Sequence, residues 1–276
     1  MHFESFSWLL PLVALLAAGL FAGFCAGMFG IGGGFVVVPA LLLVLPLIGG
    51  DKTEFPHVAV GTSAATIIVA SLRSVTAHAK RGAVDFEILK SWAPWLILGD
   101  TAGVVLASSV HGNILLLIFA VGVLMMSVMF IVPWLSRLVI SDQMPTGFTR
   151  IAIAGGLGTF SSLLGIGGGT IAITVMTLCS RTIHKAIATA SGIGTLIAIP
   201  TTIGFAIIGF YKPGLPWGSI GYINIPAAIA ISSMSILTAP FGVAAAHRLP
   251  AAPLKRVFGA YLVLISLFMF KKALKL

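Results

Sequence analysis

The feature that most constrains this chain is a long uncharged stretch near its beginning. Trp8–Gly50 contains no Asp, Glu, Lys or Arg over 43 residues, whereas about 20 apolar residues suffice for one helix to span a bilayer. Over the whole chain, 58% of residues are hydrophobic and 8% are charged, against about 25% charged in a typical soluble domain. These features predict an all-α integral membrane protein that crosses the bilayer several times.

The charged residues and cysteines exclude several other classes of protein. The first basic residue is Lys52, so the basic n-region of a signal peptide is missing and we expect the first apolar segment to be retained. The net charge of +9 comes from basic residues in short loops, which indicates membrane orientation rather than a nucleic-acid partner. Cys25 and Cys179 lie inside apolar segments, so we expect packing residues, with no disulfide framework and no metal site.

Ten apolar segments divide the chain into two sets of five. The basic stretch Trp134–Arg150 separates the two sets and is typical of a linker. We therefore predict a first membrane repeat over 1–134, a linker over 135–147 and a second membrane repeat over 148–276. The predicted segments are 8–28, 31–48, 57–79, 91–109, 112–134, 148–164, 166–180, 184–210, 219–246 and 254–271.

The two sets share motifs in the same order. The sequence GIGGG occurs at Gly30–Gly34 and again at Gly165–Gly169, an offset of 135. HVAVGTSAA, which begins at His57, resembles HKAIATASG, which begins at His184, at an offset of 127. An odd number of crossings in each copy would invert the second copy relative to the first. The sequence therefore predicts two inverted repeats of about five hydrophobic segments each.

The basic residues predict an orientation with the N-terminus outside. Only Lys52 and Lys212 then oppose the positive-inside rule within the loops. Ten full crossings would also leave the lysines of the tail KKALKL outside, so we expect one segment to be re-entrant or broken. The basic residues that this orientation places in the cytoplasm are Lys80, Arg81, Lys90, Arg137, Arg150, Arg181, Lys185, Arg248, Lys255 and Arg256.

Both GIGGG motifs predict broken or re-entrant helices, because each glycine costs about 1 kcal/mol relative to Ala in a helix. Matched breaks in two repeats indicate a substrate site between them, and amides at the start of the following helix favour anions. The alternative is that the glycines only permit tight helix packing, and the sequence leaves both interpretations open. The candidate glycines are Gly30, Gly32, Gly33, Gly34, Gly165, Gly167, Gly168 and Gly169.

A cluster of hydroxyl side chains follows each glycine motif. Hydroxyl donors combined with backbone amides suit oxyanions such as sulfonate or carboxylate, so these residues are candidates for the same substrate site. The alternative is that each hydroxyl bonds its own helix four residues back, as is common in membrane helices. The clusters are Thr62, Ser63 and Thr66 in the first copy and Thr189, Ser191 and Thr195 in the second.

Few titratable side chains lie inside the apolar segments. Asp100 is the acidic residue at greatest depth, and intramembrane carboxylates are usually functional or paired, so it could carry a coupling proton or balance Arg73. Arg73 lies seven residues from Lys80, and snorkelling to the cytoplasmic interface is the favoured interpretation. His57 and His184 open equivalent helices, where we favour helix capping or interfacial placement over proton transfer.

The segments GIGGGFVVVPAL and HVAVGTSAA, with the weaker second set GIGGGTIAI and HKAIATASG, resemble the sulfite exporter TauE/SafE family. The resemblance covers nearly the whole chain. It implies a bacterial inner-membrane transporter with two repeated helical units that moves sulfur-containing anions, usually by export. The GTS motif of the family corresponds to Gly61, Thr62 and Ser63, whereas the second copy departs from it, with Ala188–Ser191 reading ATAS.

The residues and the resemblance together predict a secondary transporter of small sulfur-containing anions such as sulfite or organosulfonates, with export as the expected direction. A passive anion channel, or a transporter of another small carboxylate or inorganic anion, is the alternative. An enzyme is disfavoured because HExxH and GxSxG are absent and Asp100 has no second acid at depth. We expect no cofactor, a small anionic substrate, and protons as a candidate coupling ion.

Overall fold

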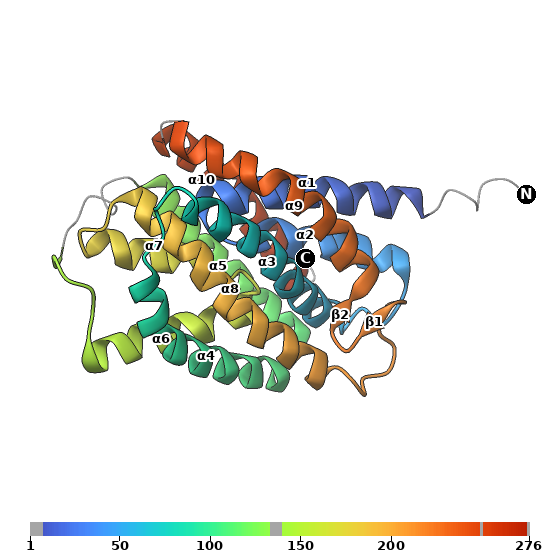
Figure 1. Ribbon diagram of the computed structural model, residues 1–276. Helices are drawn as coiled ribbons and strands as arrows, with labels where there is room; N and C mark the ends of the chain where they lie inside the picture. The colour runs from blue at the N-terminus through green and yellow to red at the C-terminus, as the bar shows by residue number, and fades with distance from the viewer. Residues whose placement is uncertain (1–7, 133–139, 249–250, 275–276) are drawn as a thin grey trace, which may run out of the picture.

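The computed structural model describes residues 8–132, 140–248 and 251–274, and within them the chain forms ten α-helices (Figure 1). The ten helices follow the ten predicted segments. Residues 133–139, at the end of the predicted first repeat and the start of the predicted linker, lie outside the described residues, so the repeat and linker boundaries stay predictions. The elements are α1 (Leu9–Phe29), α2 (Gly34–Ile48), α3 (Phe55–Ala79), α4 (Phe86–Ser109), α5 (Gly112–Ile131), α6 (Gly147–Leu164), α7 (Gly169–Leu178), α8 (Ile183–Ile208), β1 (Ser219–Ile220), β2 (Ile223–Asn224), α9 (Ile225–Arg248) and α10 (Ala251–Ala273).

A short antiparallel hairpin departs from the all-α prediction. β1 pairs with β2 in the register Ser219 to Asn224 and Ile220 to Ile223, where we expected the apolar segment 219–246 to begin. The physical reason is helix capping: the side-chain oxygen of Asn224 accepts a hydrogen bond from the Ala227 amide at 3.1 Å. A residue that caps the first turn in this way fixes the start of the following helix, so α9 begins at Ile225.

Five of the described helices are long and apolar enough to cross a membrane, namely α1, α3, α5, α8 and α9. α2 and α7 are also apolar but have only 15 and 10 residues. At 1.5 Å per residue they reach about 22 and 15 Å, less than the roughly 30 Å of a bilayer core. The fold is therefore a helical multi-pass membrane protein with two helices too short to span.

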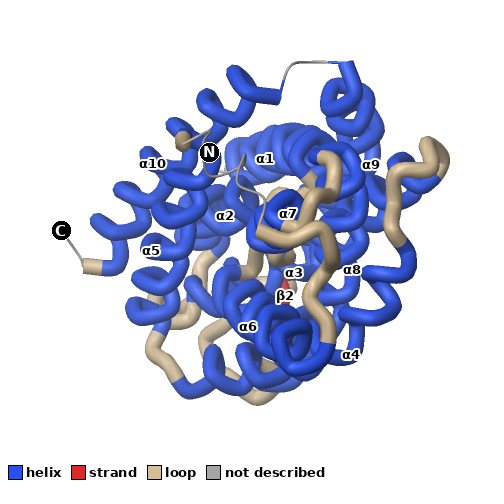
Figure 2. Tube along the Cα trace, turned by 90° about the vertical axis from the view of Figure 1, so that its left-hand side faces the viewer, coloured by secondary structure: helices blue, strands red, loops and turns tan. Residues whose placement is uncertain are grey.

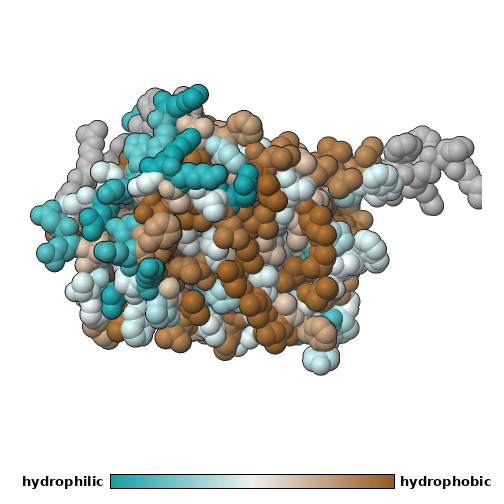
Figure 3. Space-filling model, in the orientation of Figure 1, coloured by the Kyte–Doolittle hydropathy of each residue, from teal (hydrophilic) through white to brown (hydrophobic). Residues whose placement is uncertain are grey.

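The helices pack in pairs, each with one helix from the first set of predicted segments and one from the second. α1 packs along α9 and α6 packs along α4, while α3 pairs with α8 and α5 with α10. Seen along the helices, α2, α3 and α7 lie toward the middle of the bundle, with α1, α9, α4, α6, α5 and α10 around them (Figure 2). Hydrophobic residues cover much of the visible face, and hydrophilic residues gather at the left-hand end, where α3 ends and α8 begins (Figure 3).

The chain breaks at both GIGGG motifs in the same backbone conformation. α1 ends at Phe29 and α2 starts at Gly34, with left-handed φ angles of 67°, 73° and 82° at Gly30, Gly32 and Gly33. The break between α6 and α7 repeats this pattern, with φ angles of 61°, 71° and 66° at the corresponding glycines. Side chains with a Cβ rarely adopt these angles, so glycine is required to make each turn.

The two glycine turns pack directly against each other. A Cβ added to Gly34 would lie 2.2 Å from the Gly165 carbonyl oxygen, and one added to Gly169 would lie 2.1 Å from the Gly30 carbonyl oxygen. Each turn also meets the long helix of the other half, because a Cβ on Gly30 would lie 2.4 Å from the Ile187 carbonyl oxygen. We call this reciprocal backbone contact the glycine crossing.

The glycine crossing predicts the effect of a single methyl group. Gly34→Ala should lower stability by about 1–3 kcal/mol, the usual cost of overpacking a dense interior, because the new Cβ cannot fit beside the Gly165 carbonyl group. The midpoint of thermal unfolding in detergent measures this change. Gly156→Ala in α6 is the matched control, since a Cβ there meets nothing within 4 Å, and it should be neutral or stabilising. Equal midpoints for the two variants would show that the contact does not constrain the fold.

Candidate functional site

The glycine crossing brings the first turns of two helices together in the protein interior. All residues of 30–34 and 165–169 are buried. Among the described residues, the backbone amides of Gly34 and Phe35 in α2, and of Gly169 and Thr170 in α7, donate to no protein carbonyl group. Helix N-termini carry partial positive charge through such amides. The crossing therefore presents two sets of buried donors without backbone partners.

Three of the predicted hydroxyl residues hold separate segments together. The Thr62 hydroxyl oxygen accepts a hydrogen bond from the Asn224 amide at 2.8 Å, and that of Thr189 accepts one from the Asp85 amide at 2.9 Å. Thr62 and Thr189 occupy matching motif positions, and each ties down the loop that leads into a helix of the other half. The Ser63 hydroxyl donates to the Gly165 carbonyl oxygen at 2.8 Å. Ala190 stands at the position that matches Ser63 and has no hydroxyl to do the same.

The other predicted hydroxyl residues bond their own helices. Thr66 donates to the Ser63 carbonyl oxygen at 2.8 Å, Ser191 to that of Ile187 at 3.1 Å and Thr195 to that of Ser191 at 3.4 Å. Ser191 Oγ also lies 2.9 Å from Ser74 Oγ. These three side chains therefore follow the alternative stated in the sequence analysis, in which a hydroxyl bonds the backbone of its own helix.

Two serines that sequence reasoning missed have buried hydroxyls without a partner. Ser71 and Ser161 are each 1% exposed, and neither Oγ atom has a hydrogen-bond partner among the described residues. A Cβ on Gly168 would lie 2.5 Å from Ser161 Oγ, and one on Gly194 would lie 2.9 Å from Ser71 Oγ. Both hydroxyls therefore lie beside the glycine crossing, since Gly194 also packs against the Gly167 carbonyl group.

A helical-spacing signal for these serines was present in the sequence. Ser71 follows Ser63 by eight residues, a spacing that keeps both on one face of α3, and Ser161 precedes Gly165 by four residues. The matching positions in the other half are Ala198 and Ala26. The search for paired motifs overlooked both serines because neither is repeated.

Asp100 and Arg73 lie in different places and do not pair with each other. The Thr201 hydroxyl donates to Asp100 Oδ1, and Asp100 Oδ2 is buried without a partner. Arg73 instead lines a pocket with Lys80 and Arg81 near the end of α3. The charge pair considered between Asp100 and Arg73 is therefore not formed within the described residues.

The two predicted histidines differ in their surroundings. His57 is 6% exposed, and its ring stacks on Tyr222 with centroids 5.0 Å apart. His57 Nε2 lies 3.2 Å from the Ala107 carbonyl oxygen, which only accepts, so the proton is assigned to Nε2. His184 is exposed and stacks on His247 with centroids 5.1 Å apart.

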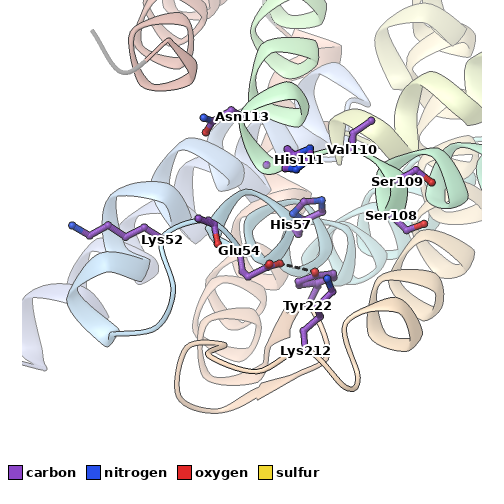
Figure 4. Close-up of a pocket in the computed structure, with 12 residues that line it drawn as sticks. Lys52, Glu54, His57, Ser108, Ser109, Val110, His111, Asn113, Lys212 and Tyr222 are labelled. Atoms are coloured by element: carbon purple, nitrogen blue, oxygen red, sulfur yellow. Dashed lines mark hydrogen bonds between the residues drawn. The ribbon is translucent and has the colours of Figure 1, made fainter.

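His57 lines a cavity of about 650 Å³ at the start of α3 (Figure 4). The Tyr222 hydroxyl donates to Glu54 Oε2 at 2.6 Å, and burial together with this carboxylate raises the pKa of Tyr222 above its usual range. Tyr222 therefore keeps its proton and remains a donor. The lining residues are Lys52, Thr53, Glu54, His57, Ser108, Ser109, Val110, His111, Gly112, Asn113, Lys212 and Tyr222. We call this space the α3 cavity.

The lysines of the α3 cavity are the two that opposed the charge rule. Lys52 and Lys212 lie far apart in the sequence, yet both line this space. Figure 4 shows Lys212 next to Tyr222, whereas the Lys52 side chain points away from His57 at the rim. Asp51 lies next to Lys52 in the chain but does not line the cavity; the amide and hydroxyl of Thr53 bond its carboxylate and lower its pKa, so it stays ionised.

Comparison with known proteins assigns the chain to a family. Residues 15–269 match the sulfite exporter TauE/SafE family. The chain belongs to this family. It is 32% identical over 264 residues to a "Probable membrane transporter protein" of Haemophilus influenzae, which covers 93% of the chain and 97% of the relative. A protein of the same description from Methanocaldococcus jannaschii is 26% identical over 271 residues, or 96% and 97% of the two chains. No solved structure matches the chain.

Membership in the sulfite exporter TauE/SafE family agrees with the helical architecture. The resemblance stated from the glycine and GTS motifs is confirmed by the family match over most of the chain. The family and these relatives are described as transporters and not as enzymes. The protein is therefore a multi-pass membrane transporter rather than an enzyme.

Proposed function

We propose that the protein is a secondary transporter that exports small sulfur-containing anions, such as sulfite or organosulfonates, across a bacterial inner membrane. The family description supports this substrate class. The observation that carries the site is the set of unpartnered donors at the glycine crossing: the amides that begin α2 and α7 and the hydroxyls of Ser71 and Ser161. Buried donors without partners are costly, and an oxyanion is a ligand that accepts hydrogen bonds from donors of this kind.

We infer that the halves 1–134 and 148–276, joined by a linker at 135–147, are inverted repeats. The reciprocal contacts of Gly34 with Gly165 and of Gly169 with Gly30 support this interpretation, as does the matched pairing of α1 with α9 and of α6 with α4. Inverted repeats alternate access by moving one unit against the other around a central site. The glycine crossing lies where such a site is expected.

The burial of the glycine crossing favours a carrier over a passive channel. A channel needs a continuous open path, whereas the residues of both glycine motifs are buried in this conformation. We propose that the α3 cavity is the opening on one side of the membrane, where Lys212 and Lys52 attract or release the anion. With the predicted orientation this is the outer side. Transport of another small carboxylate or inorganic anion remains the second candidate.

The site proposal predicts that two serines affect binding without affecting stability. Ser71→Ala and Ser161→Ala should each weaken anion binding by about tenfold or more, because each removes a hydrogen bond to a charged ligand. Stability without ligand should stay within about 0.5 kcal/mol, since neither hydroxyl has a partner to lose. Ligand-induced thermal shift with sulfite, sulfoacetate, thiosulfate and sulfate measures both quantities.

Ser63→Ala is the matched control for this experiment. It removes a hydroxyl that is bonded to Gly165, so it should lower stability by about 1 kcal/mol. If Ser71→Ala and Ser161→Ala keep the full ligand shift of the wild type, the anion does not bind at these hydroxyls and the glycine crossing serves packing alone.

The α3 cavity predicts a charge effect on transport. Lys212→Gln should raise KM about threefold to fivefold and leave the maximal rate nearly unchanged, because the lysine attracts the anion before the crossing is reached. Counterflow in proteoliposomes measures both parameters, and the difference should shrink as salt screens the charge. Lys271→Gln is the control, because Lys271 is an exposed lysine on α10 outside the cavity lining. An equal change in both variants would argue against a role for the cavity.

We also propose that Asp100 carries the coupling proton. Asp100→Asn keeps an acceptor for Thr201 but cannot exchange a proton, so it should remove the pH dependence of counterflow. Thr201→Val is the control, since it removes the partner and keeps the carboxyl group; its pH dependence should persist. An Asp100→Asn variant with the wild-type rate and pH profile would show that Asp100 is structural.

A further inference from the structure

A second pocket lies at the other end of α3 from the α3 cavity. It has a volume of about 280 Å³ and is formed mainly by the last turns of α3, with α9 on one side. Its lining residues are Arg73, Thr76, Ala77, Lys80, Arg81 and Pro240. Three of these six residues are cations, and no part of the substrate proposal uses them. We call this space the basic pocket.

The basic pocket is positively charged without a local acid. The sequences of α3 and α9 contain no Asp or Glu. Arg81 Nη1 donates to the Val243 carbonyl oxygen at 3.0 Å, which holds the guanidinium group against α9. Asp85, in the loop after α3, accepts a hydrogen bond from the Ile88 amide at 3.1 Å, which holds its carboxylate at the start of α4. The three cations therefore face the pocket uncompensated by carboxylates of these elements.

Exposed apolar side chains lie near lining residues of the basic pocket along α3 and α9. Leu72 precedes Arg73 on α3 and is 44% exposed, while Leu237 and Phe241 lie on either side of Pro240 along α9 and are 57% and 69% exposed. Arg73 lies seven residues before Lys80, about 10 Å along the helix axis. The two helices that form the pocket therefore both carry exposed apolar side chains close in sequence to its lining residues.

We propose that the basic pocket binds the phosphate headgroup of an anionic phospholipid, whose acyl chains lie against Leu72, Leu237 and Phe241. Basic pockets between membrane helices favour anionic headgroups, at about 1 kcal/mol per Lys or Arg near the surface. A free oxyanion shares the phosphate chemistry and could enter the same pocket. The exposed apolar side chains favour the lipid, because a soluble anion has no group to place against them. This inference does not depend on the identity of the transported substrate.

Thermal unfolding in neutral detergent, with added lipid, tests the proposal. Dioleoyl phosphatidylglycerol should stabilise the wild-type protein, whereas dioleoyl phosphatidylcholine and soluble glycerol phosphate should have little effect at the same concentration. The double variant Arg73→Gln/Lys80→Gln should bind phosphatidylglycerol about fivefold more weakly for each cation removed. The double variant Lys90→Gln/Lys185→Gln is the control. It removes two lysines that are exposed and outside the pocket lining, and it should bind as the wild type does.

Three results would overturn the proposal. The first is unchanged affinity for phosphatidylglycerol in Arg73→Gln/Lys80→Gln. The second is an equal loss in Lys90→Gln/Lys185→Gln, which would show diffuse attraction by net charge. The third is stabilisation by glycerol phosphate equal to that by phosphatidylglycerol, which would identify a site for a soluble oxyanion. Transport assays are not needed for any of these measurements, so failure here is distinct from failure of the proposed function.

Discussion

The backbone contact between the two glycine turns is the constraint on which the rest of the structure depends. At Gly34 and Gly169 the chains approach so closely that a carbonyl oxygen of one turn occupies the space of a Cβ on the other. Two short helices, α2 and α7, can then begin inside the protein, because each glycine turn is packed against the other. The long helices α3 and α8 pack beside each other and meet these turns at Val60 and Ile187.

The helices and their breaks could be predicted because they depend on local chemistry. Apolar runs set the ten helices, and consecutive glycines disfavour helix at both motifs. The side-chain partners could not be predicted, because they depend on which segments meet. Thr62 lies far in sequence from Asn224, and Ser63 from Gly165. The short hairpin before α9 was missed for a related reason, since the apolar residues around it hid the capping role of Asn224.

The polar groups near the glycine crossing fall into two kinds that the sequence does not separate. Thr62, Ser63 and Thr189 have partners on other segments and stabilise the fold. Ser71 and Ser161 have no hydrogen-bond partner within the part of the chain that the structure describes. Repetition drew attention to Thr62 and Thr189, which make matching contacts from the two motifs. Residues that break a pattern were also useful: Lys52 and Lys212 oppose the positive-inside rule, and both line the α3 cavity.

The hydrogen bond from Ser63 to Gly165 has no counterpart at Ala190, and this asymmetry has an energetic consequence for a carrier. If the two halves exchange roles as access alternates, the arrangement that one half has in the first conformation is adopted by the other half in the second conformation. A hydrogen bond available to one half alone contributes about 1 kcal/mol to one conformation and not to the other. That difference corresponds to about a fivefold ratio of populations. The empty carrier would then rest mostly open to one side, and its two half-cycles would run at unequal rates.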